Sequence, residues 1–348
     1  MKRIQLGNTV FEGQNDVYLF EGDSGPTTLV DTGVATPDGR EQLREGLAEY
    51  GLSFGDVDVI LLTHWHHDHT GLAGEIQEES NATVYVHEDD APLVSGDEAA
   101  WDAAEDLRDE LWDEWGMPAD ARAELEEFLE LHDRIQGRSP NVETFGDGAT
   151  FDLGSVELRA VHLPGHAAGL AGFAFDGARV GDDASEGDRE LLSGDALLPK
   201  YTPNVGGADP RVEDPLGTYL DSLARIIDAD YARAWPGHRD PIADPAARAR
   251  DIAVHHRERT ERVLSVLRDR GEADAWTVSA DLFGDLSEIH IMHGPGEAWA
   301  HLDHLEREGV VERTDEGYAL LDEDPDLDAI FDYGGQSDEK PPEAATED

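Results

Sequence analysis

Residues 63–69 read Thr-His-Trp-His-His-Asp-His. Within this stretch lies an H-x-H-x-D-H pattern, formed by His64, His66, Asp68 and His69. Three imidazoles and one carboxylate offer nitrogen and oxygen ligands, a set that suits zinc or iron better than calcium or magnesium. A chance cluster of histidines on a loop is a poor explanation, because the rest of a ligand set follows downstream.

The neighbouring segments predict where these candidate ligands lie. Residues 57–62 form a short apolar run rich in β-branched side chains, which is typical of a buried strand. A helix is expected to begin after Gly71, with residues 72–76. The ligands would then occupy a loop between a strand and a helix, where α/β proteins usually place their sites.

Three later segments each end in a candidate ligand that directly follows a glycine. These are His166 after the strand-like residues 155–161, Asp195 after residues 190–192, and His238 after residues 230–235. Glycine lets the backbone turn tightly and approach a bound ion closely. Each position taken singly is more often an ordinary turn residue. Their order after the first pattern makes all three candidate metal ligands.

Together these motifs resemble those of the metallo-β-lactamase superfamily of hydrolases. The resemblance covers about residues 1–240 and includes Leu29-Val30-Asp31-Thr32-Gly33, which is similar to the family's early strand and D-T-G turn. It implies an α/β fold, an αββα sandwich, with a dinuclear metal site. It also implies one metal on His64, His66 and His166, a second on Asp68, His69 and His238, and Asp195 as the bridge. Zinc is the expected metal, with iron and manganese as alternatives.

Two such ions imply a hydrolytic mechanism. Metals about 3.5–4 Å apart can share a bridging hydroxide and polarise the carbonyl or phosphoryl oxygen that it attacks. Asp68 is the candidate for relaying a proton to the leaving group, although a ligand carboxylate should have a low pKa. Asp31 is expected to orient a ligand histidine rather than to bind metal. His67 is expected to be exposed or to lie behind the ligands, and structural roles are expected for His87 and His162. His301 and His304, three apart on a probable helix, could bind a surface metal, but helix packing is favoured for them.

The composition is extremely acidic. The chain has 79 Asp and Glu against 26 Lys and Arg, for a formal net charge of −53, and it has no cysteine. The missing cysteine excludes disulfides and thiolate ligands, which argues against the commonest subclass of true β-lactamases. No apolar run is long enough for a membrane span, and no apolar signal region is evident. We therefore expect a soluble cytoplasmic protein of a salt-accumulating halophile, although an acidic protein with basic partners is the alternative.

Three stretches differ from the hydrolase core. Residues 97–136 should form two helices inserted between core strands, either as a lid over the site or as an excursion into solvent. Residues 176–188 should form a loop. The acidic tail 322–348 is expected to be partly disordered, chiefly in its last dozen or so residues.

Residues 245–321 resemble a winged-helix domain appended to the hydrolase. One helix would include residues 255–267, Thr277 would cap a second, and residues 295–307 would form a third. Residues 309–313 and 318–321 would form the wing about an Asp-Glu-Gly turn. Superfamily members with a similar arrangement include β-lactamase-like endoribonucleases and glyoxalase-II-like hydrolases.

The first of these helices is rich in arginine. Its cations are Arg248, Arg250, Arg257, Arg259, Arg262, Arg268 and Arg270. Such a stripe could bind phosphates of RNA, or its members could pair with acids elsewhere in the chain. The second interpretation is favoured, because so acidic a chain repels nucleic acid.

Two classes of function follow. The first is a metal-dependent hydrolase of a small thioester, ester or lactone, in which Lys200 and Tyr201, just beyond Asp195, meet a small anionic substrate. The second is an endoribonuclease or nucleic-acid-binding protein that uses the winged helix. Whether the arginines pair with acids or face solvent discriminates between them. No membrane partner is expected, and a homodimer is left open. Flavodiiron proteins fit less well, because they carry a Glu where His66 stands.

The dispersed acidity generates a testable prediction about salt. Repulsion among the acids should destabilise the folded chain at low salt, whereas near 1 M salt the screening length falls to about 3 Å. We expect the Tm to rise markedly between about 0.1 M and about 2 M KCl. Calorimetry at constant added zinc would measure this, and a Tm that stayed flat or fell would contradict the halophilic interpretation.

Overall fold

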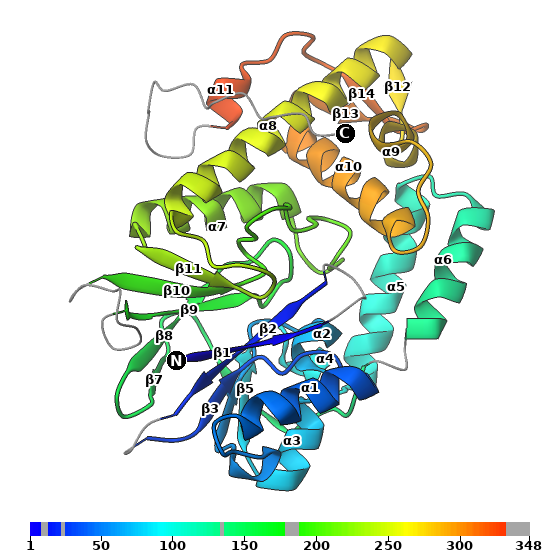
Figure 1. The fold of residues 1–348 in the computed structure, drawn as a ribbon. Coiled ribbons are helices and arrows are strands. Elements are labelled where there is room, and N and C mark those ends of the chain that lie inside the picture. The colour runs from blue at the N-terminus through cyan, green and yellow to red at the C-terminus, as the bar shows by residue number, and fades with distance from the viewer. Residues whose placement is uncertain (8–12, 22–24, 133–135, 178–187, 332–348) are drawn as a thin grey trace.

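The computed structural model describes residues 1–7, 13–21, 25–132, 136–177 and 188–331 of the chain. Two β-sheets lie face to face, and helices cover their outer faces (Figure 1). The expected α/β class and αββα sandwich are therefore confirmed. The sandwich brings the ends of strands from both sheets together, and this is what positions the site.

The first sheet has the strand order β1-β2-β3-β4-β5-β6. Its strands are β1 (Lys2–Leu6), β2 (Asn15–Phe20), β3 (Thr28–Val30), β4 (Val59–Leu61), β5 (Thr83–His87) and β6 (Val142–Phe145). Strands β3 to β6 are parallel, and β1 and β2 continue the sheet antiparallel. The helices α1 (Pro37–Ala48) and α3 (Ala73–Ser80), with the short 3-10 helix η1 (Phe54–Asp56), cover its outer face.

The side chains of strand β2 are buried on both faces of this sheet. Val17 and Leu19 pack in the core beneath α1 and α3, whereas Tyr18 and Phe20 pack in the core between the two sheets. Successive side chains of a strand point to opposite faces, so a strand buried on both sides needs a continuous apolar run.

The second sheet has the order β11-β10-β9-β8-β7. Its strands are β7 (Thr150–Asp152), β8 (Glu157–His162), β9 (Ala171–Asp176), β10 (Arg189–Gly194) and β11 (Arg233–Pro236). Helix α7 (Pro215–Ala229) and the first turns of α8 (Pro245–Arg270) cover its outer face. Strands β8, β10 and β11 run in the same direction, so their carboxyl ends meet at one edge.

The C-terminal segment adds a helical module with a small sheet. Its further elements are β12 (Glu272–Ala273), α9 (Ala275–Phe283), α10 (His290–Arg307), β13 (Val311–Arg313) and β14 (Tyr318–Leu320). Two expectations were wrong in detail. Asp274, not Thr277, caps α9, because its carboxylate accepts from the backbone N–H of Thr277. Helix α10 begins at His290, and Pro295 lies inside it.

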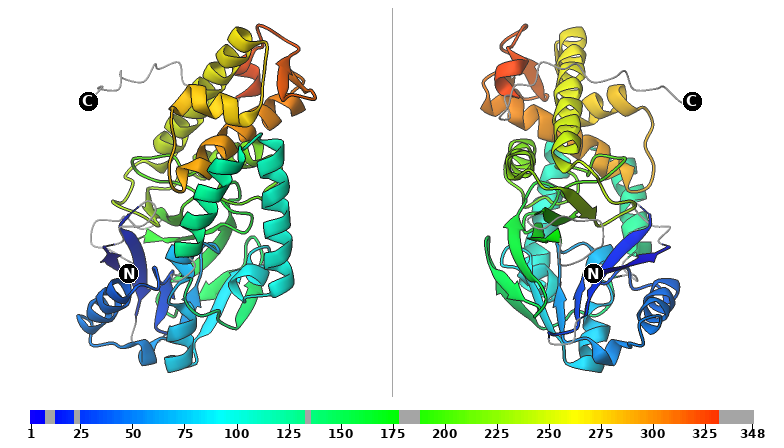
Figure 2. Two further views of the ribbon diagram at one scale, coloured as in Figure 1. Left: turned by 90° about the vertical axis from the view of Figure 1, so that its right-hand side faces the viewer. Right: turned by 60° about the vertical axis from the view of Figure 1, so that its left-hand side comes forward.

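The inserted segment forms α5 (Glu98–Glu114) and α6 (Ala119–His132), preceded by the short helix α4 (Ala91–Val94). These helices do not extend into solvent, because they stand against α9 and α10 (Figure 2). Trp112 and Trp115 of this segment share one apolar core with Val278 and Leu302. Glu114 strengthens the contact by accepting from Trp299 Nε1 at 2.7 Å. The insertion and the C-terminal module therefore form one packed unit.

The remaining expectations concern loops and the C-terminus. Strand β9 ends at Asp176 and β10 begins at Arg189, and residues 178–187 lie outside the described residues. A short helix, α11 (Leu327–Ile330), packs against the C-terminal core, whereas the tail from residue 332 onward also lies outside the described part. No helix in the described ranges combines the length and apolar composition needed to cross a membrane.

Candidate metal centre

All seven predicted ligands converge at one edge of the two sheets. They are His64 and His66 after β4, Asp68 and His69 in the short helix α2 (His67–Thr70), His166 after β8, Asp195 after β10, and His238 after β11. Parallel strands end at the same edge of a sheet, which is why side chains from such distant parts of the sequence meet here.

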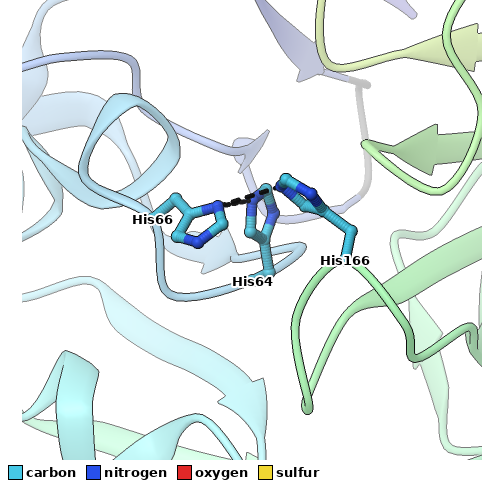
Figure 3. Close-up of side chains that lie close together, drawn as sticks. All are labelled: His64, His66 and His166. Carbon is cyan, nitrogen blue, oxygen red and sulfur yellow. Dashed lines mark hydrogen bonds between the residues drawn. The ribbon is translucent and has the colours of Figure 1, made fainter. Parts of the chain in front are cut away.

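Three of the histidines form a first group (Figure 3). The Nδ1 atom of His66 lies 2.9 Å from Nε2 of His64 and 3.1 Å from Nε2 of His166. The opposite nitrogens of His66 and His166 contact the backbone carbonyls of Ala208 at 3.1 Å and Asn204 at 2.8 Å. A neutral imidazole that donates from one nitrogen presents only a lone pair at the other. Two lone pairs therefore face each other, an arrangement that a shared cation would stabilise.

Burial favours the neutral form of this first group. It lowers the pKa of His66 to about 3, and the neighbouring His166 acts in the same direction. Burial also lowers the pKa of His64, whose Nδ1 lies 3.0 Å from the hydroxyl of Thr63. The neutral imidazole is the form that binds a metal ion.

Asp68, His69 and His238 form a second group. His238 Nε2 lies 3.4 Å from Asp68 Oδ2, and His69 Nε2 lies 3.8 Å from Asp68 Oδ1. Both Nε2 atoms are buried without a hydrogen-bond partner in the described chain. The opposite nitrogens are held by Asp31 Oδ2 at 2.9 Å for His69 and by the carbonyl of Gly13 at 2.9 Å for His238. Each imidazole is thus fixed in orientation, with its free nitrogen directed at the site.

Asp31 takes the orienting position that the sequence predicts. Besides contacting His69, its carboxylate accepts hydrogen bonds from both the backbone N–H and the hydroxyl of Thr63, each at 2.8 Å. The residue adopts a left-handed backbone conformation, with φ of 61°. Asp31 therefore connects the loop that follows β3 to the ligand loop after β4.

Asp195 lies between the two groups. Its Oδ2 atom is 3.8 Å from His166 Nε2, 3.5 Å from His69 Nε2 and 3.3 Å from His238 Nε2. Its Oδ1 atom is buried without a hydrogen-bond partner among the described residues. Burial alone would lower the pKa of His69, but Asp195, Asp68 and Asp31 raise it to about 10. The site thus attracts positive charge, and its donor atoms fit metal ions.

Comparisons with known proteins agree with this geometry. A family model described as the Metallo-beta-lactamase superfamily matches residues 10–181. The chain is also similar to a metallo-beta-lactamase family protein from Thermus thermophilus whose crystal structure is known. The two sequences are 32% identical, and the match covers 91% of this chain and 97% of the Thermus chain, with a TM-score of 0.76. The chain belongs to the metallo-β-lactamase superfamily.

Two other relatives of this chain have names that describe a function. The "Probable metallo-hydrolase YqjP" of Bacillus subtilis (strain 168) is 28% identical over 305 residues, which cover 86% of this chain and 90% of the relative. The "Atrochrysone carboxyl ACP thioesterase" of Aspergillus chevalieri is 23% identical over 291 residues, covering 83% of this chain and 72% of the relative. Both matches extend well beyond the segment that carries the ligands.

A partly buried arginine holds the ligand loop of this metallo-β-lactamase fold in place. Arg211 contacts the carboxylates of Asp90 at 2.7 Å and Asp209 at 2.6 Å, and both carboxylates are fully buried. Asp90 accepts from the backbone N–H of Trp65, and Asp209 accepts from the Trp65 indole, each at 3.0 Å. Because Trp65 lies between His64 and His66 in the sequence, this clamp fixes the loop that presents both histidines.

A cavity of about 830 Å³ opens at the metal centre. Its far walls are formed by the inserted helices and by the start of α10, so the insertion does overhang the site. The apolar lining includes Trp65, Leu93, Trp101, Leu111, Phe128, Leu129, Ile289 and Met292. The cations of the lining, within the described chain, are Arg108, which pairs with Asp109 at 3.2 Å, and Arg211, which pairs with Asp90 at 2.7 Å.

Lys200 and Tyr201 do not line this cavity. The Lys200 ammonium lies 5.3 Å from the centre of the Tyr201 ring, and the Arg239 guanidinium lies 5.0 Å from the same ring. Arg248 also donates to the backbone carbonyl of Tyr201. The chain leaves the cavity after Leu198, and Arg108 lines the cavity where these two residues do not.

The remaining histidines make contacts within the fold. His67 stacks on Trp101 of α5, with ring centroids 5.8 Å apart. His87 and His162 stack on each other at 4.0 Å, and with the half-exposed Asp89 they form a separate group of potential ligand atoms.

His301 and His304 both belong to the buried face of α10. His301 contacts the hydroxyl of Thr260 at 2.7 Å, and its other ring nitrogen lies 3.3 Å from His256. His304 lies 3.3 Å from Asp214. These contacts join α10 to α7 and α8.

Several residues that support the site have no signal in the sequence. Asp90, Asp209 and Arg211 are common residue types in so acidic a chain, and no spacing marks them. Asn204 and Ala208 act through backbone carbonyls, which every residue has.

The clamp generates a prediction about stability. Arg211→Met would leave two buried carboxylates without their cation, and breaking a buried ion pair in this way typically costs about 3–5 kcal/mol. We expect a fall of this size in the free energy of unfolding, measured by urea denaturation in concentrated KCl. As a control, Arg225→Met removes a half-exposed ion pair with Asp147 and should cost about 1 kcal/mol or less. Equal effects of the two substitutions would contradict the assignment.

Proposed function

We propose that this protein is a dinuclear metal-dependent hydrolase that cleaves a thioester, ester or lactone. The observation that carries the proposal is the position of Asp195 Oδ2 between the two groups of ligand atoms, 3.8 Å from His166 and 3.3 Å from His238. At the coarser level, the protein is a metallo-hydrolase of its superfamily. The name of the thioesterase from Aspergillus chevalieri supports the choice of a thioester.

The roles of the chain's own residues follow from their geometry. Two bound ions, which we propose to be zinc, would supply a water acidic enough to attack near neutral pH and a Lewis acid for the carbonyl oxygen. His64, His66 and His166 would hold one ion, and Asp68, His69 and His238 the other. Asp68 accepts from Asn15 Nδ2 at 3.2 Å, which fixes the orientation of its carboxylate. Burial would raise the pKa of Asp68, but His69 and His238 lower it, which favours metal binding by this carboxylate over proton relay.

The cavity supports a substrate with an apolar acyl group. Aromatic and aliphatic side chains of α5, α6 and α10 line the space beyond the ligands. Trp101 offers a large apolar surface there, and its indole N–H is already occupied by the carbonyl of Leu93 at 3.0 Å. Arg108 would meet an anionic part of the substrate. The space exceeds what a very small acyl group needs, so the acyl group of the natural substrate is proposed to be bulky.

The nucleic-acid alternative loses its main support. Six of the seven arginines of α8 bond to other described groups: Arg257, Arg259 and Arg270 pair with acids, and Arg248, Arg262 and Arg268 donate to backbone carbonyls. We retain the winged-helix assignment for residues 245–321 as a proposal. Its third helix, α10, is buried from Gly294 to Leu305, which supports ranking the hydrolase first, because a recognition helix needs an exposed face to enter a groove.

The bridging carboxylate provides the test of the metal centre. Asp195→Asn keeps the shape of the side chain but removes its charge. We expect the metal content to fall from about two zinc ions per chain, because the carboxylate no longer attracts the ions. Turnover of acyl thioesters should fall by more than about 100-fold. Elemental analysis and a panel of thioesters, lactones and RNA would measure both. Asp89→Asn, in the separate surface group, is the matched control and should change neither. Wild-type protein that hydrolyses thioesters without metal would overturn the proposal.

The apolar wall provides a test of the substrate class. Trp101→Ala removes a large apolar contact from the cavity, so we expect kcat/KM for thioesters of bulky apolar acids to fall about 10- to 100-fold. An acetyl thioester would not reach this wall and should be cleaved as by the wild type. If both substrates lost activity equally, Trp101 would be supporting the metal centre rather than selecting the acyl group.

A further inference from the structure

The loop of residues 204–208 supports two of the candidate metal ligands. The carbonyl of Asn204 contacts His166 Nδ1 at 2.8 Å, and the carbonyl of Ala208 contacts His66 Nε2 at 3.1 Å. Both histidines belong to the first group. A small displacement of this loop would therefore rotate two of the three imidazoles that share that metal.

The same loop rests directly on helix α10 of the C-terminal module. A Cβ atom built on Gly296 would overlap the Cα of Gly207, and one built on Gly206 would overlap the carbonyl of Gly296. Only glycines permit so close an approach of two backbones. The side chain of Asn204 adds a polar link, because its Nδ2 donates to the carbonyl of His293 at 3.0 Å.

Helix α10 is itself held firmly. Every residue from Gly294 to Leu305 is buried. Ala298, Leu302 and Leu305 pack in the core that α10 shares with α5, α8 and α9. The position of the loop is consequently set by a helix that contributes no ligand.

The second group is supported by other parts of the chain. His69 is oriented by Asp31, His238 by the carbonyl of Gly13, and Asp68 by Asn15. All three of these partners lie in the first 31 residues, and none belongs to the 204–208 loop. The two groups therefore have separate supports.

We propose that α10 positions the first metal group through the 204–208 loop, and that Asn204 and Gly296 are the positioning residues that transmit its position. The proposal rests on the proposed metal centre. Residues that orient metal ligands typically affect metal affinity by about 10- to 100-fold. A disturbance of the contact between α10 and the loop should therefore weaken the first metal selectively, leaving the second with its own supports.

Two substitutions disturb this contact in different ways. Gly296→Ala introduces a methyl group that forces the loop away, although alanine itself favours a helix more than glycine does. Asn204→Ala removes the hydrogen bond to α10 without adding volume, and it also removes the bond that Asn204 Oδ1 accepts from the backbone N–H of Gly207 within the loop. Gly294→Ala is the matched control, because it makes the same change on the same helix. Its Cβ would meet the side chains of Ser279 and Leu286 rather than the loop.

Each metal can be measured alone in a background that lacks the other. His238→Ala leaves the first group intact, and His64→Ala leaves the second group intact. Zinc affinity is determined by competition with a chromophoric chelator, and circular dichroism verifies folding. We expect Gly296→Ala and Asn204→Ala to weaken zinc about 10- to 100-fold in the His238→Ala background and less than about threefold in the His64→Ala background. Gly294→Ala should leave both affinities within about threefold of their backgrounds.

Three results would overturn the proposal. One is an unchanged zinc affinity in the His238→Ala background for both loop variants. Another is an equal loss in both backgrounds, which would indicate general destabilisation. The third is a loss with Gly294→Ala as large as that with Gly296→Ala. If Gly296→Ala fails to fold, the zinc affinity of Asn204→Ala in the His238→Ala background tests the proposal by itself. Absence of zinc from the unmodified chain is a different result, because it would refute the metal centre itself.

Discussion

The structure depends on holding imidazole nitrogens close together with their lone pairs facing each other. The Nδ1 atom of His66 and the Nε2 atom of His166 are 3.1 Å apart, and the hydrogen-bond partners behind them leave only lone pairs at these positions. The two lone pairs repel each other unless a cation lies between the nitrogens. The fold opposes this repulsion by fixing each imidazole from behind, and by holding the ligand loop with the carboxylates that Arg211 neutralises. The sandwich supplies a rigid edge on which these supports converge.

The ligands could be predicted because each is a distinctive residue type that directly follows a strand or its turn. Their supports could not, because the carbonyls of Gly13, Asn204 and Ala208 carry no signature in the sequence. Asp31 is the exception, since it lies in a recognisable turn after an early strand. Proximity to Asp195 in the sequence favours Lys200 and Tyr201 as substrate contacts, but the chain leaves the cavity after Leu198, before it reaches either residue.

The sequence predicts which segments form helices, but it does not predict which segments pack against them. Apolar spacing in residues 97–136 indicates helices with a buried face, yet it does not say what covers that face. The cover is the C-terminal module, whose residues are distant in sequence. Likewise, the charge of α8 is visible in the sequence, whereas the pairing of Arg257 with Asp328 and of Arg259 with Glu297 needs the folded chain. The sequence pattern of a segment shows which of its faces must be buried. The topology of the whole chain determines which other segment covers that face.

The distribution of the ligands along the chain has a consequence for folding. His64 and His238 are 174 positions apart (238 − 64), and the support of His238 comes from Gly13. Contacts of such long range form only when both sheets have assembled. Ions at this centre would bind the native chain far better than a partly folded one. A ligand that binds only the native state stabilises it by mass action, by about 4 kcal/mol at a thousand times its Kd. The metal supply of the cell would then help to set how long each newly made chain stays folded.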